Sequence, residues 1–300
     1  MTDSDKHGDR DGTGMQKDPA PDPRWGRPGP LHDPRLLAGF KGRPSDVLIT
    51  TAPKAGTTWM QQILHQLRSG GDTDFRSIYD VVPWLERPRP GKDWRVVLAE
   101  YEAMSDPRIF KTHCTYPQTP AADTVRIVLT SRDPRDCCVS FYHHLMDMTP
   151  EARRRAGIPR PASFDEFFER WLDFGAWFRN VQSWWPHFRD PNVLWLRYED
   201  LKRDFPAALD RIAAFLGWSL TPVQREKVLE YCSFSWMRAH AERFTRFSAD
   251  EAPLFRPGGF IRKGQSGGYR ELLSPAHEAR ILAKAREMLE PACLSFLELA

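Results

Sequence analysis

The segment 53–59, with the sequence PKAGTTW, constrains the fold of this chain more than any other. It follows an apolar, β-branched run at 47–51 and opens an amphipathic stretch at 59–67. This order predicts a strand, a tight loop and a helix start, which together form a cradle for an anion. Unpaired N–H groups and the positive end of the helix dipole face such a loop, its Gly admits close approach of the backbone, and its Lys adds a full charge.

The same segment also fits an ordinary strand-to-helix turn. The longer phosphate-loop pattern, G-x-x-x-x-G-K-[ST], is absent, because Lys54 precedes the only Gly of a shorter loop. We therefore interpret the segment as a variant, P-loop-like cradle whose assignment depends on further residues.

Length and composition fit one large domain. The chain has 300 residues without an evident internal linker, and its formal net charge of +3 gives no support for nucleic-acid binding. Its five cysteines lack the paired spacing of a metal or redox site, which indicates reduced thiols and a cytoplasmic location. No stretch has the length and apolar character needed to span a bilayer. Residues 1–34 are polar and rich in Asp, Gly and Pro, so we expect a disordered tail there and a single domain over 35–300.

Strand-like runs alternate with helical segments, which predicts an α/β fold with a central parallel sheet flanked by helices. The nearly continuous apolar run at 124–130 is typical of a strand covered on both faces. The other predicted strands are 47–51, 108–113 and 192–196, and the longer predicted helices are 163–178, 201–216 and 274–288. A long loop is predicted at 245–268, and such loops in compact domains are usually lids or binding segments.

Polar side chains follow the predicted strands, where ligands bind in an open parallel sheet. Lys54 follows the first strand, Lys111 and His113 close the second, and Arg132 follows the third. Tyr198 follows the last strand, although it could also be a packing residue there. Because the carboxyl ends of parallel strands meet at one edge, we expect these groups to share one site.

Over residue 41 to the C-terminus, the chain resembles cytosolic sulfotransferases in the order of five motifs. These enzymes use 3′-phosphoadenosine 5′-phosphosulfate (PAPS), so the resemblance implies a PAPS-dependent sulfotransferase. The motifs are PKAGTTW at 53–59, KTH at 111–113, RDPRD at 132–136 with VSFYH at 139–143, YEDLK at 198–202, and FIRKG at 260–264.

The resemblance implies catalytic roles for His113, Lys54 and Lys111. His113 is implied to be the general base that takes the proton of the acceptor hydroxyl. Lys54 would stabilise charge on the departing phosphate oxygen, and Lys111 would be a second cation near the transferring group. In-line sulfuryl transfer needs positioning, a base and cations, much as phosphoryl transfer does, and no metal is predicted.

The resemblance also implies which residues bind PAPS. The loop and the helix start would hold the 5′-phosphosulfate, aromatic residues would line the adenine, and a guanidinium, a hydroxyl and a basic loop would bind the 3′-phosphate. In that order, the residues are Lys54, Gly56, Thr57 and Thr58; Trp59, Tyr198, Ser233 and Phe234; and Arg132, Ser140, Arg262, Lys263 and Gly264. Ala55 stands where Ser is usual in the family, and the usual dimer pattern is missing at 270–279, which leaves the oligomeric state open.

The acceptor is predicted to be a small-molecule or lipid-like compound that presents a hydroxyl group on an apolar body. The residues expected to build an apolar pocket for it are Trp84, Phe141, His144, Met146, Met148, Phe244 and Phe247. The insertion at 149–161, which contains three consecutive arginines, either covers this pocket or is a solvated loop.

Two other functions stay open at the level of sequence. A nucleotide kinase would use the same cradle for ATP and magnesium, and it predicts a longer phosphate loop and an acidic metal ligand, neither of which we find. A non-catalytic module that binds adenosine 3′,5′-bisphosphate would keep Arg132 and Arg262, but it would have no need for Lys111 and His113 together.

Overall fold

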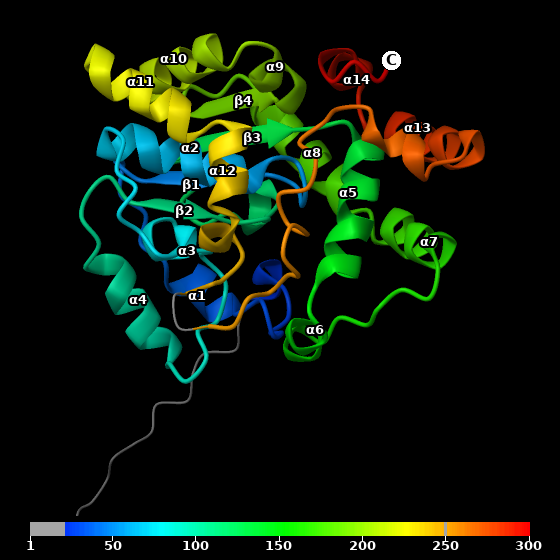
Figure 1. Ribbon diagram of the computed structural model, residues 1–300, viewed down its shortest axis with the longest axis horizontal. Coiled ribbons are helices and arrows are strands. Elements are labelled where there is room, and N and C mark those ends of the chain that lie inside the picture. The colour runs from blue at the N-terminus through cyan, green and yellow to red at the C-terminus, as the bar shows by residue number, and fades with distance from the viewer. Residues whose placement is uncertain (1–21, 249–250) are drawn as a thin grey trace, which may run out of the picture.

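The computed structural model describes residues 22–248 and 251–300, and in this part of the chain a four-stranded sheet forms the centre of the molecule (Figure 1). The order of the strands is β2-β1-β3-β4, and each neighbouring pair is parallel. The carboxyl ends of the strands therefore meet at one edge. The strands are β1 (Val47–Ile49), β2 (Ile109–Lys111), β3 (Arg126–Ser131) and β4 (Val193–Arg197).

Helices surround the sheet and make up most of the remaining ordered structure (Figure 1). They are α1 (Pro34–Gly39), α2 (Thr57–Ser69), α3 (Ile78–Val81), α4 (Trp94–Glu102), α5 (Pro134–Asp147), α6 (Pro150–Ala156), α7 (Phe164–Phe174), α8 (Ala176–Trp184), α9 (Tyr198–Arg203), α10 (Phe205–Leu216), α11 (Pro222–Tyr231), α12 (Phe234–Ala239), α13 (Pro275–Met288) and α14 (Pro291–Phe296). Short 3-10 turns lie at Pro23–Trp25, Tyr116–Gln118, Trp185–His187, Ala241–Phe244 and Gly268–Glu271.

Two hydrophobic clusters lie on the two faces of the sheet. Along β3, Ile127 and Leu129 belong to one cluster and Val128 to the other, because successive side chains of a strand point to opposite faces. The first cluster includes buried residues of α1, α4, α5, α8 and α13, and the second includes buried residues of α2, α10 and α11. The predicted α/β fold with a parallel sheet between helices is confirmed.

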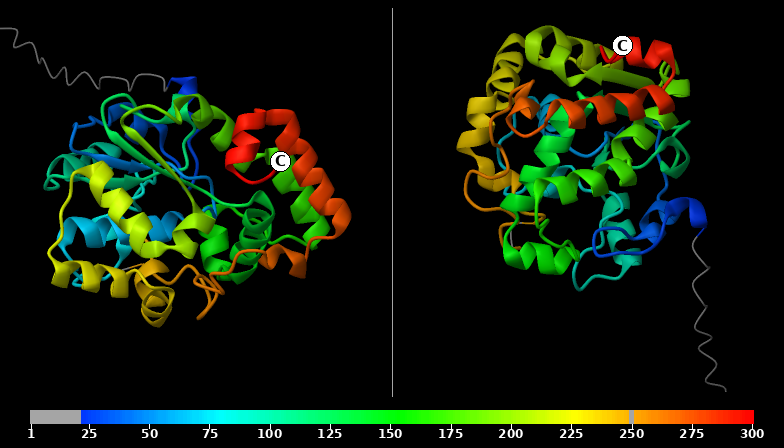
Figure 2. Two further views of the ribbon diagram at one scale, coloured as in Figure 1. Left: turned by 90° about the horizontal axis from the view of Figure 1, so that it is seen from above. Right: turned by 90° about the vertical axis from the view of Figure 1, so that its right-hand side faces the viewer.

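The C-terminal helices extend the molecule on one side of the sheet. Figure 2 shows α13, in orange, beside the green helices α5 and α8, and α13 contacts both of these helices as well as α14. Its buried residues, Ile281 and Ala285, belong to the same cluster as α5 and α8. The predicted last helix, 274–288, is therefore confirmed and completes the core on this face.

Two predicted helices are divided where the chain cannot continue helically. Gly175, in the left-handed region at φ 59°, separates α7 from α8 within 163–178. Asp204 separates α9 from α10 within 201–216, because Pro206 belongs in the first turn of a helix. Helices α4, α6 and α11 form in segments that we did not predict to be helical. In the described part of 245–267, one bridge from Phe255 to Met148 is the only strand pairing, which agrees with the predicted loop.

The expected disordered tail, 1–34, overlaps the described residues at 22–34, where the chain packs against the domain. Trp25 is 6% exposed and belongs to the first cluster, and its carbonyl oxygen lies 2.5 Å from Nε2 of His32. Asp33 caps α1 by accepting the N–H of Arg35. Ordered packing thus begins before residue 35, because a single large aromatic residue anchors a segment whose composition is otherwise polar. Residues 1–21 of the predicted tail lie outside the described residues.

A buried ion pair fixes the start of the sheet. Arg108, just before β2, donates to the carboxylate of Asp46, just before β1, at 2.9 and 2.6 Å, and both side chains are fully buried. Arg108 also donates to the carbonyl of Lys41. The pair therefore ties together the two chain segments that enter β1 and β2.

Two further expectations concern the membrane and the thiols. Among the described residues, no helix combines the length and apolar character needed to cross a membrane. Cys114, Cys137, Cys138, Cys232 and Cys293 are all buried, free thiols, as predicted.

Candidate active site

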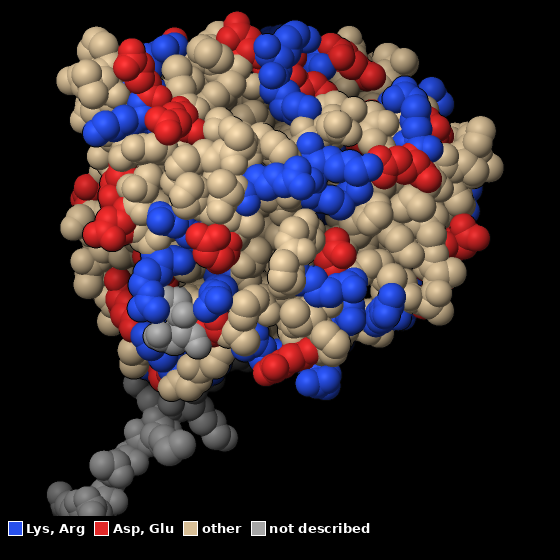
Figure 3. Space-filling view, in the orientation of Figure 1, with Lys and Arg blue, Asp and Glu red and all other residues tan. Residues whose placement is uncertain are grey.

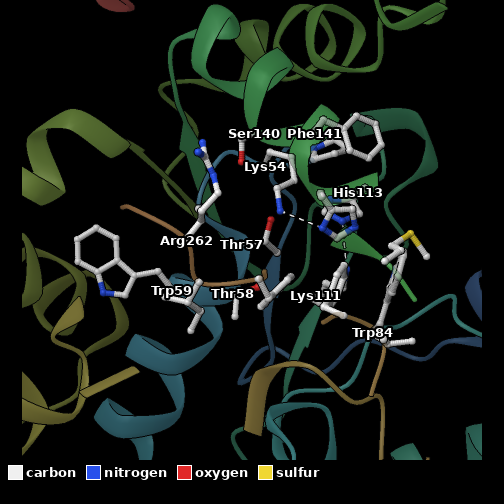
Figure 4. Close-up of a pocket in the computed structure, with 18 of the residues that line it drawn as sticks. Lys54, Thr57, Thr58, Trp59, Trp84, Lys111, His113, Ser140, Phe141 and Arg262 are labelled. Atoms are coloured by element: carbon white, nitrogen blue, oxygen red, sulfur yellow. Dashed lines mark hydrogen bonds between the residues drawn. The ribbon is translucent and has the colours of Figure 1, made fainter. Parts of the chain in front are cut away.

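All residues that the sequence predicted to be catalytic or to bind PAPS line a single cavity of about 840 Å³. In Figure 4, the side chains of Lys54, Lys111 and His113 point toward one another. Arg262 lies on one side of them and Trp84 on the other. The cavity lies where the four strands end, as expected for an open parallel sheet.

The loop between β1 and α2 has the backbone geometry of an anion cradle. Lys54 has a φ of 69°, which is rare for a residue other than Gly and marks a locally constrained backbone. Gly56 has a φ of 99° and caps α2 without a side-chain hydrogen bond, so it leaves the first N–H groups of the helix open toward the cavity. A Cβ atom at Gly56 would lie 2.9 Å from the ring of Tyr198, which explains the need for Gly. The hydroxyl groups of Thr51 and Thr57 lie 2.5 Å apart behind this loop.

Lys54 reaches the centre of the cavity and contacts a second basic side chain. Its Nζ lies 3.1 Å from Nδ1 of His144, on α5, and 5.1 Å from the centroid of the Phe260 ring. Burial, together with the positive charge of Arg132, lowers the pKa of Lys54 to about 8. The pKa of His144 is also lowered well below its usual value, first by burial and then by the charge of Lys54. Neutral His144 therefore accepts a hydrogen bond from Lys54.

The ring of His113 is oriented by a backbone carbonyl. Its Nδ1 lies 2.7 Å from the carbonyl oxygen of Thr51, and this nitrogen therefore carries the proton and donates it. Its Nε2 lies 3.1 Å from Nζ of Lys111 and is left as an acceptor. Burial lowers the pKa of His113 well below the usual value, and the charge of Lys111 adds to this effect. His113 is thus a neutral imidazole with Nε2 available as a base.

Lys111 is buried at the end of β2, and its ammonium group lies 3.3 Å from the centroid of the Trp84 ring. Burial lowers the pKa of Lys111 to about 7, against the opposing charge of Glu86. Glu86 is 3% exposed, and its carboxylate accepts the backbone N–H of His113 at 3.4 Å. Glu86 is a site residue that the sequence did not reveal, because it lies in an irregular segment without a readable pattern.

Arg132 has a guanidinium with an unused donor in the described structure. Its Nη2 donates to the carbonyl of Gln265 at 2.8 Å and lies 3.4 Å from the carboxylate of Asp136. The guanidinium lies 4.8 Å from the centroid of the Tyr198 ring. Its Nε is buried without a hydrogen-bond partner among the residues described. An anion in the cavity would satisfy this donor.

The segment 260–269 is fastened to α5 by Asp136, whose part in the site the sequence analysis did not foresee. Its buried carboxylate accepts the N–H groups of Gly267 at 2.8 Å and Tyr269 at 3.0 Å. These bonds hold the basic segment 262–264 beside Arg132. The available signal was the acidic residue that ends the RDPRD motif, four residues after Arg132 and next to Arg135, since an acid beside two arginines suggests a fixed partner.

The other residues predicted to bind PAPS line the same cavity and come from several elements. Trp59 donates through Nε1 to the carbonyl of Cys232 at 2.8 Å, and its ring packs edge-on against Tyr198. Ser233 caps α12. A Cβ atom at Gly264 would lie 2.6 Å from the ring of Phe234, so this Gly permits the close contact. The remaining lining residues in this part are Thr58, Ser140, Arg262 and Lys263.

Of the seven residues expected to build an acceptor pocket, five line the cavity and two lie elsewhere. Phe244 is fully buried in the second hydrophobic cluster, where it packs against Phe75, and Met146 does not line the cavity. Helical periodicity explains why Met146 does not line the cavity. Other residues of α5 form the face of this helix that lines the cavity, and Met146 lies on a different face. The predicted residues that do line it are Trp84, Phe141, His144, Met148 and Phe247. Of the two readings of the insertion, the structure supports the cover, since α6 contributes Ala152, Arg155 and Ala156 to the lining.

Basic side chains gather on one face of the molecule (Figure 3). Figure 3 shows a band of Lys and Arg side chains across the middle of the face, over the segment between α12 and α5. Within the described residues, no group of three or more His, Cys, Asp or Glu side chains is arranged to hold a metal ion. A mechanism without metal stays a prediction.

Comparisons with known proteins place this chain in one family. The model of the sulfotransferase domain matches residues 44–290. Sulfotransferase 1A1 of the dog, Canis lupus familiaris, is 31% identical over 275 residues, which cover 87% of this chain and 88% of the relative. Human sulfotransferase 1E1 is 28% identical over 270 residues and covers 87% of this chain and 89% of its own length.

Solved structures give the same result. Mouse sulfotransferase SULT7A1 complexed with PAP has a TM-score of 0.71 at 25% identity and covers 89% of this chain and 93% of that one. Retinol dehydratase in complex with androsterone and inactive cofactor PAP shares the fold, with a TM-score of 0.70 at 22% identity, over 85% of this chain and 84% of that one. The chain belongs to the sulfotransferase family and is of the cytosolic type. The predicted enzyme class, a PAPS-dependent sulfotransferase, is confirmed.

Proposed function

We propose that this protein transfers the sulfuryl group of PAPS to a hydroxyl group on an apolar small-molecule or lipid-like acceptor, with His113 as the general base. The observation that carries the proposal is the meeting of Lys54, His113 and Arg132 in one cavity, which continues into an apolar region lined by Trp84 and Phe247. A polyanionic donor and an apolar acceptor need such a divided cavity.

The donor side fits a nucleotide with two phosphorylated ends. The open N–H groups of α2 and Lys54 suit the 5′ end, and the buried, unpartnered Nε of Arg132 suits a second anion. The aromatic rings of Trp59 and Tyr198 contact each other in the lining of the same cavity and suit adenine. The PAP complex of the mouse relative supports PAPS as the donor.

The residues of the site divide the chemistry among them. PAPS supplies the sulfuryl group. Nε2 of His113 takes the proton of the acceptor hydroxyl, while the Thr51 carbonyl holds the ring through Nδ1. Lys54 stabilises the negative charge that develops on the leaving phosphate, and Lys111 stabilises the transferring group. Apolar walls exclude water, which would otherwise compete as the acceptor.

The two rival functions are less well supported. The family and the absence of an acidic cluster among the described residues give a nucleotide kinase no support. A non-catalytic module for adenosine 3′,5′-bisphosphate would not need the contact of His113 with Lys111. The cytoplasmic location stays a prediction from the sequence, which left the oligomeric state open.

The test is PAPS-dependent sulfation of 2-naphthol by the purified protein, with the formation of adenosine 3′,5′-bisphosphate as the readout. We expect His113→Ala to reduce turnover by about two to four orders of magnitude, because the general base is lost. The affinity for the bisphosphate, measured by titration calorimetry, should stay nearly the same. His187→Ala, whose ring stacks on Tyr116 outside the cavity, is the control.

A chelator should leave the activity of the wild-type protein intact. Unchanged turnover in His113→Ala would remove this residue from the mechanism. Failure of the bisphosphate to raise the melting temperature of the wild-type protein would contradict the donor site itself.

A further inference from the structure

The acceptor part of the cavity is apolar near His113 but basic farther away. Trp84 lies next to His113, with the two ring centroids 5.5 Å apart, and Phe247 follows Trp84 at 6.0 Å. Beyond these rings the cavity is lined by Arg87, Arg89 and Arg155. An apolar acceptor alone gives no reason for three guanidinium groups at this end.

These arginines exceed the carboxylates available to them. Arg87 donates through Nη2 to both carboxylate oxygens of Glu251 at 3.0 Å, and Nη1 of Arg155 lies 3.6 Å from the same carboxylate. Two guanidinium groups thus share one acid. Arg89 is paired separately with Glu100, which also serves Lys92. Cations outnumber acids around this end of the cavity in the described structure.

Arg87 in particular is held in a setting that favours an anion. Its side chain is 11% exposed, and its Nε is buried without a hydrogen-bond partner among the described residues. Its guanidinium stacks on Phe247, 3.6 Å from the ring centroid, which fixes the direction of its donors. A buried donor without a partner is unfavourable, and a carboxylate is the partner that suits a guanidinium best.

The chain of contacts from His113 to Arg87 indicates how long an acceptor must be to contact both of these residues. It passes two aromatic rings, Trp84 and Phe247, with the ring contacts given above. An acceptor with a hydroxyl at one end, a rigid body about two rings long and an acid at the other end matches this path.

We propose that the end of the cavity lined by Arg87 and Arg155 binds a carboxylate of the acceptor, so that the preferred substrates are hydroxy acids with an apolar, two-ring body. The inference rests on the proposed function, since it concerns the acceptor of the same reaction. Glu251 occupies this position when no acid is bound and competes with the carboxylate of the acceptor.

A purely structural role for the three side chains is the alternative. Glu251 belongs to the segment that follows η4 (Ala241–Phe244), whereas Arg155 lies on α6, so their contact also joins two parts of the cavity wall. A latch of this kind would affect all acceptors equally. Recognition of an acid would affect only the acceptors that carry one.

The test compares 4′-hydroxybiphenyl-4-carboxylic acid with its primary amide, at saturating PAPS, by kcat/KM. We expect the acid to be preferred about tenfold or more, since the amide cannot form the charge-assisted hydrogen bond of a carboxylate with a guanidinium. Arg87→Gln and Arg155→Gln should each reduce this preference severalfold. Glu251→Gln should increase it, because the competing carboxylate is removed. Arg154→Gln, which changes an exposed arginine of α6 outside the cavity lining, is the matched control and should leave the ratio unchanged.

A shorter pair, 4-hydroxybenzoate and 4-hydroxybenzamide, tests the length. These molecules are one ring shorter, so the proposal predicts that they do not reach Arg87 from His113 and that their preference is smaller than that of the biphenyl pair. An equal preference in both pairs would mean that the general positive potential of the site, rather than Arg87 and Arg155, selects the acid, and the proposal would be wrong.

Turnover of the amide tests the proposed function separately from this inference. If the amide is sulfated without any preference for the acid, sulfuryl transfer stands and the inference is refuted. If neither compound is sulfated, calorimetric titration of both in the presence of adenosine 3′,5′-bisphosphate still decides whether the acid binds more tightly and whether Arg87→Gln removes the difference. An equal loss for acid and amide in the Arg87, Arg155 and Glu251 variants would establish a latch and overturn the proposal.

Discussion

Binding of adenosine 3′,5′-bisphosphate should take up a proton at Lys54. Burial and the charge of Arg132 lower the pKa of this lysine to about 8 in the free protein. A phosphate group beside it favours the charged form and raises the pKa again. Free Lys54 is therefore partly neutral above pH 7 and becomes charged in the complex, so the affinity must fall as the pH rises.

The size of the effect follows from the pKa. With a pKa of about 8, roughly 0.1 of Lys54 is neutral at pH 7 and roughly 0.9 at pH 9, which gives the proton uptake at each pH. The affinity for the bisphosphate should then fall about tenfold between pH 7 and pH 9, or about 1.4 kcal/mol. The second pKa of a phosphate is about 6, so the ligand itself stays ionised over this range.

Titration calorimetry measures both quantities. Uptake of about 0.5 proton at pH 8 should appear as a difference in binding enthalpy between Tris and bicine buffers, whose ionisation enthalpies differ. Lys54→Met should bind more weakly at pH 7 and lose the pH dependence. Lys111→Met should keep most of it, because Lys111 lies beside His113 and Trp84 and is assigned to the transferring group, which the bisphosphate lacks.

Two results would refute this reasoning. One is an affinity of the wild-type protein that stays constant from pH 7 to pH 9, which would mean that Lys54 does not change its charge on binding. The other is a Lys54→Met variant with the same proton uptake as the wild type, which would place the titrating group elsewhere.

Two other predictions concern the far phosphate and the sheet. Arg132→Ala should weaken bisphosphate binding by at least about 1 kcal/mol in calorimetry, because a charge-assisted hydrogen bond is lost. Arg211→Ala, which changes an exposed arginine, is the control and should have no effect. Equal affinities for both variants would contradict the contact of Arg132 with the phosphate. Asp46→Asn should reduce the free energy of unfolding, measured in urea, by about 3–5 kcal/mol, because it leaves the buried Arg108 without this carboxylate. Asp106→Asn removes the partner of Arg43 in a more exposed ion pair and should reduce the free energy of unfolding by less than about 1 kcal/mol. Similar losses in the two Asp variants would show that burial does not determine the difference.

The sheet could be predicted because its strands carry their own signal. β3 and β4 are apolar over most of their length, with their polar residues near the strand ends, and both faces of the sheet are covered. The pattern can therefore be read without knowledge of partners. Helix α11 has no comparable signal: only Val228 is buried along it, and its apolar residues do not gather on one face. It depends instead on its capping box at Thr221 and on packing against α2, which the local sequence does not reveal.

The donor side of the site could be predicted for a similar reason. Its residues follow strands directly, so the topology of a parallel sheet brings Lys54, His113 and Arg132 to one edge without further information. The acceptor side is different. Arg87, Arg155 and Glu251 come from an irregular segment, a helix in an insertion and a long loop, and only the tertiary structure brings them together.

The same burial that lowers the pKa values explains how one cavity serves two unlike ligands. With a pKa of about 7, roughly half of Lys111 is neutral at pH 7, and His113 and His144 are neutral, whereas Lys54, with a pKa of about 8, stays mostly charged. Part of the positive charge at the centre is therefore absent before an anion binds. An apolar acceptor then meets fewer solvated charges than the number of basic residues suggests. When an anionic donor binds, its own charge favours protonation of these lysines, and the cations that sulfuryl transfer requires are restored where charge develops. The number of basic residues therefore gives the positive charge of the site with its donor bound. The lowered pKa values give the smaller positive charge of the site before the donor binds.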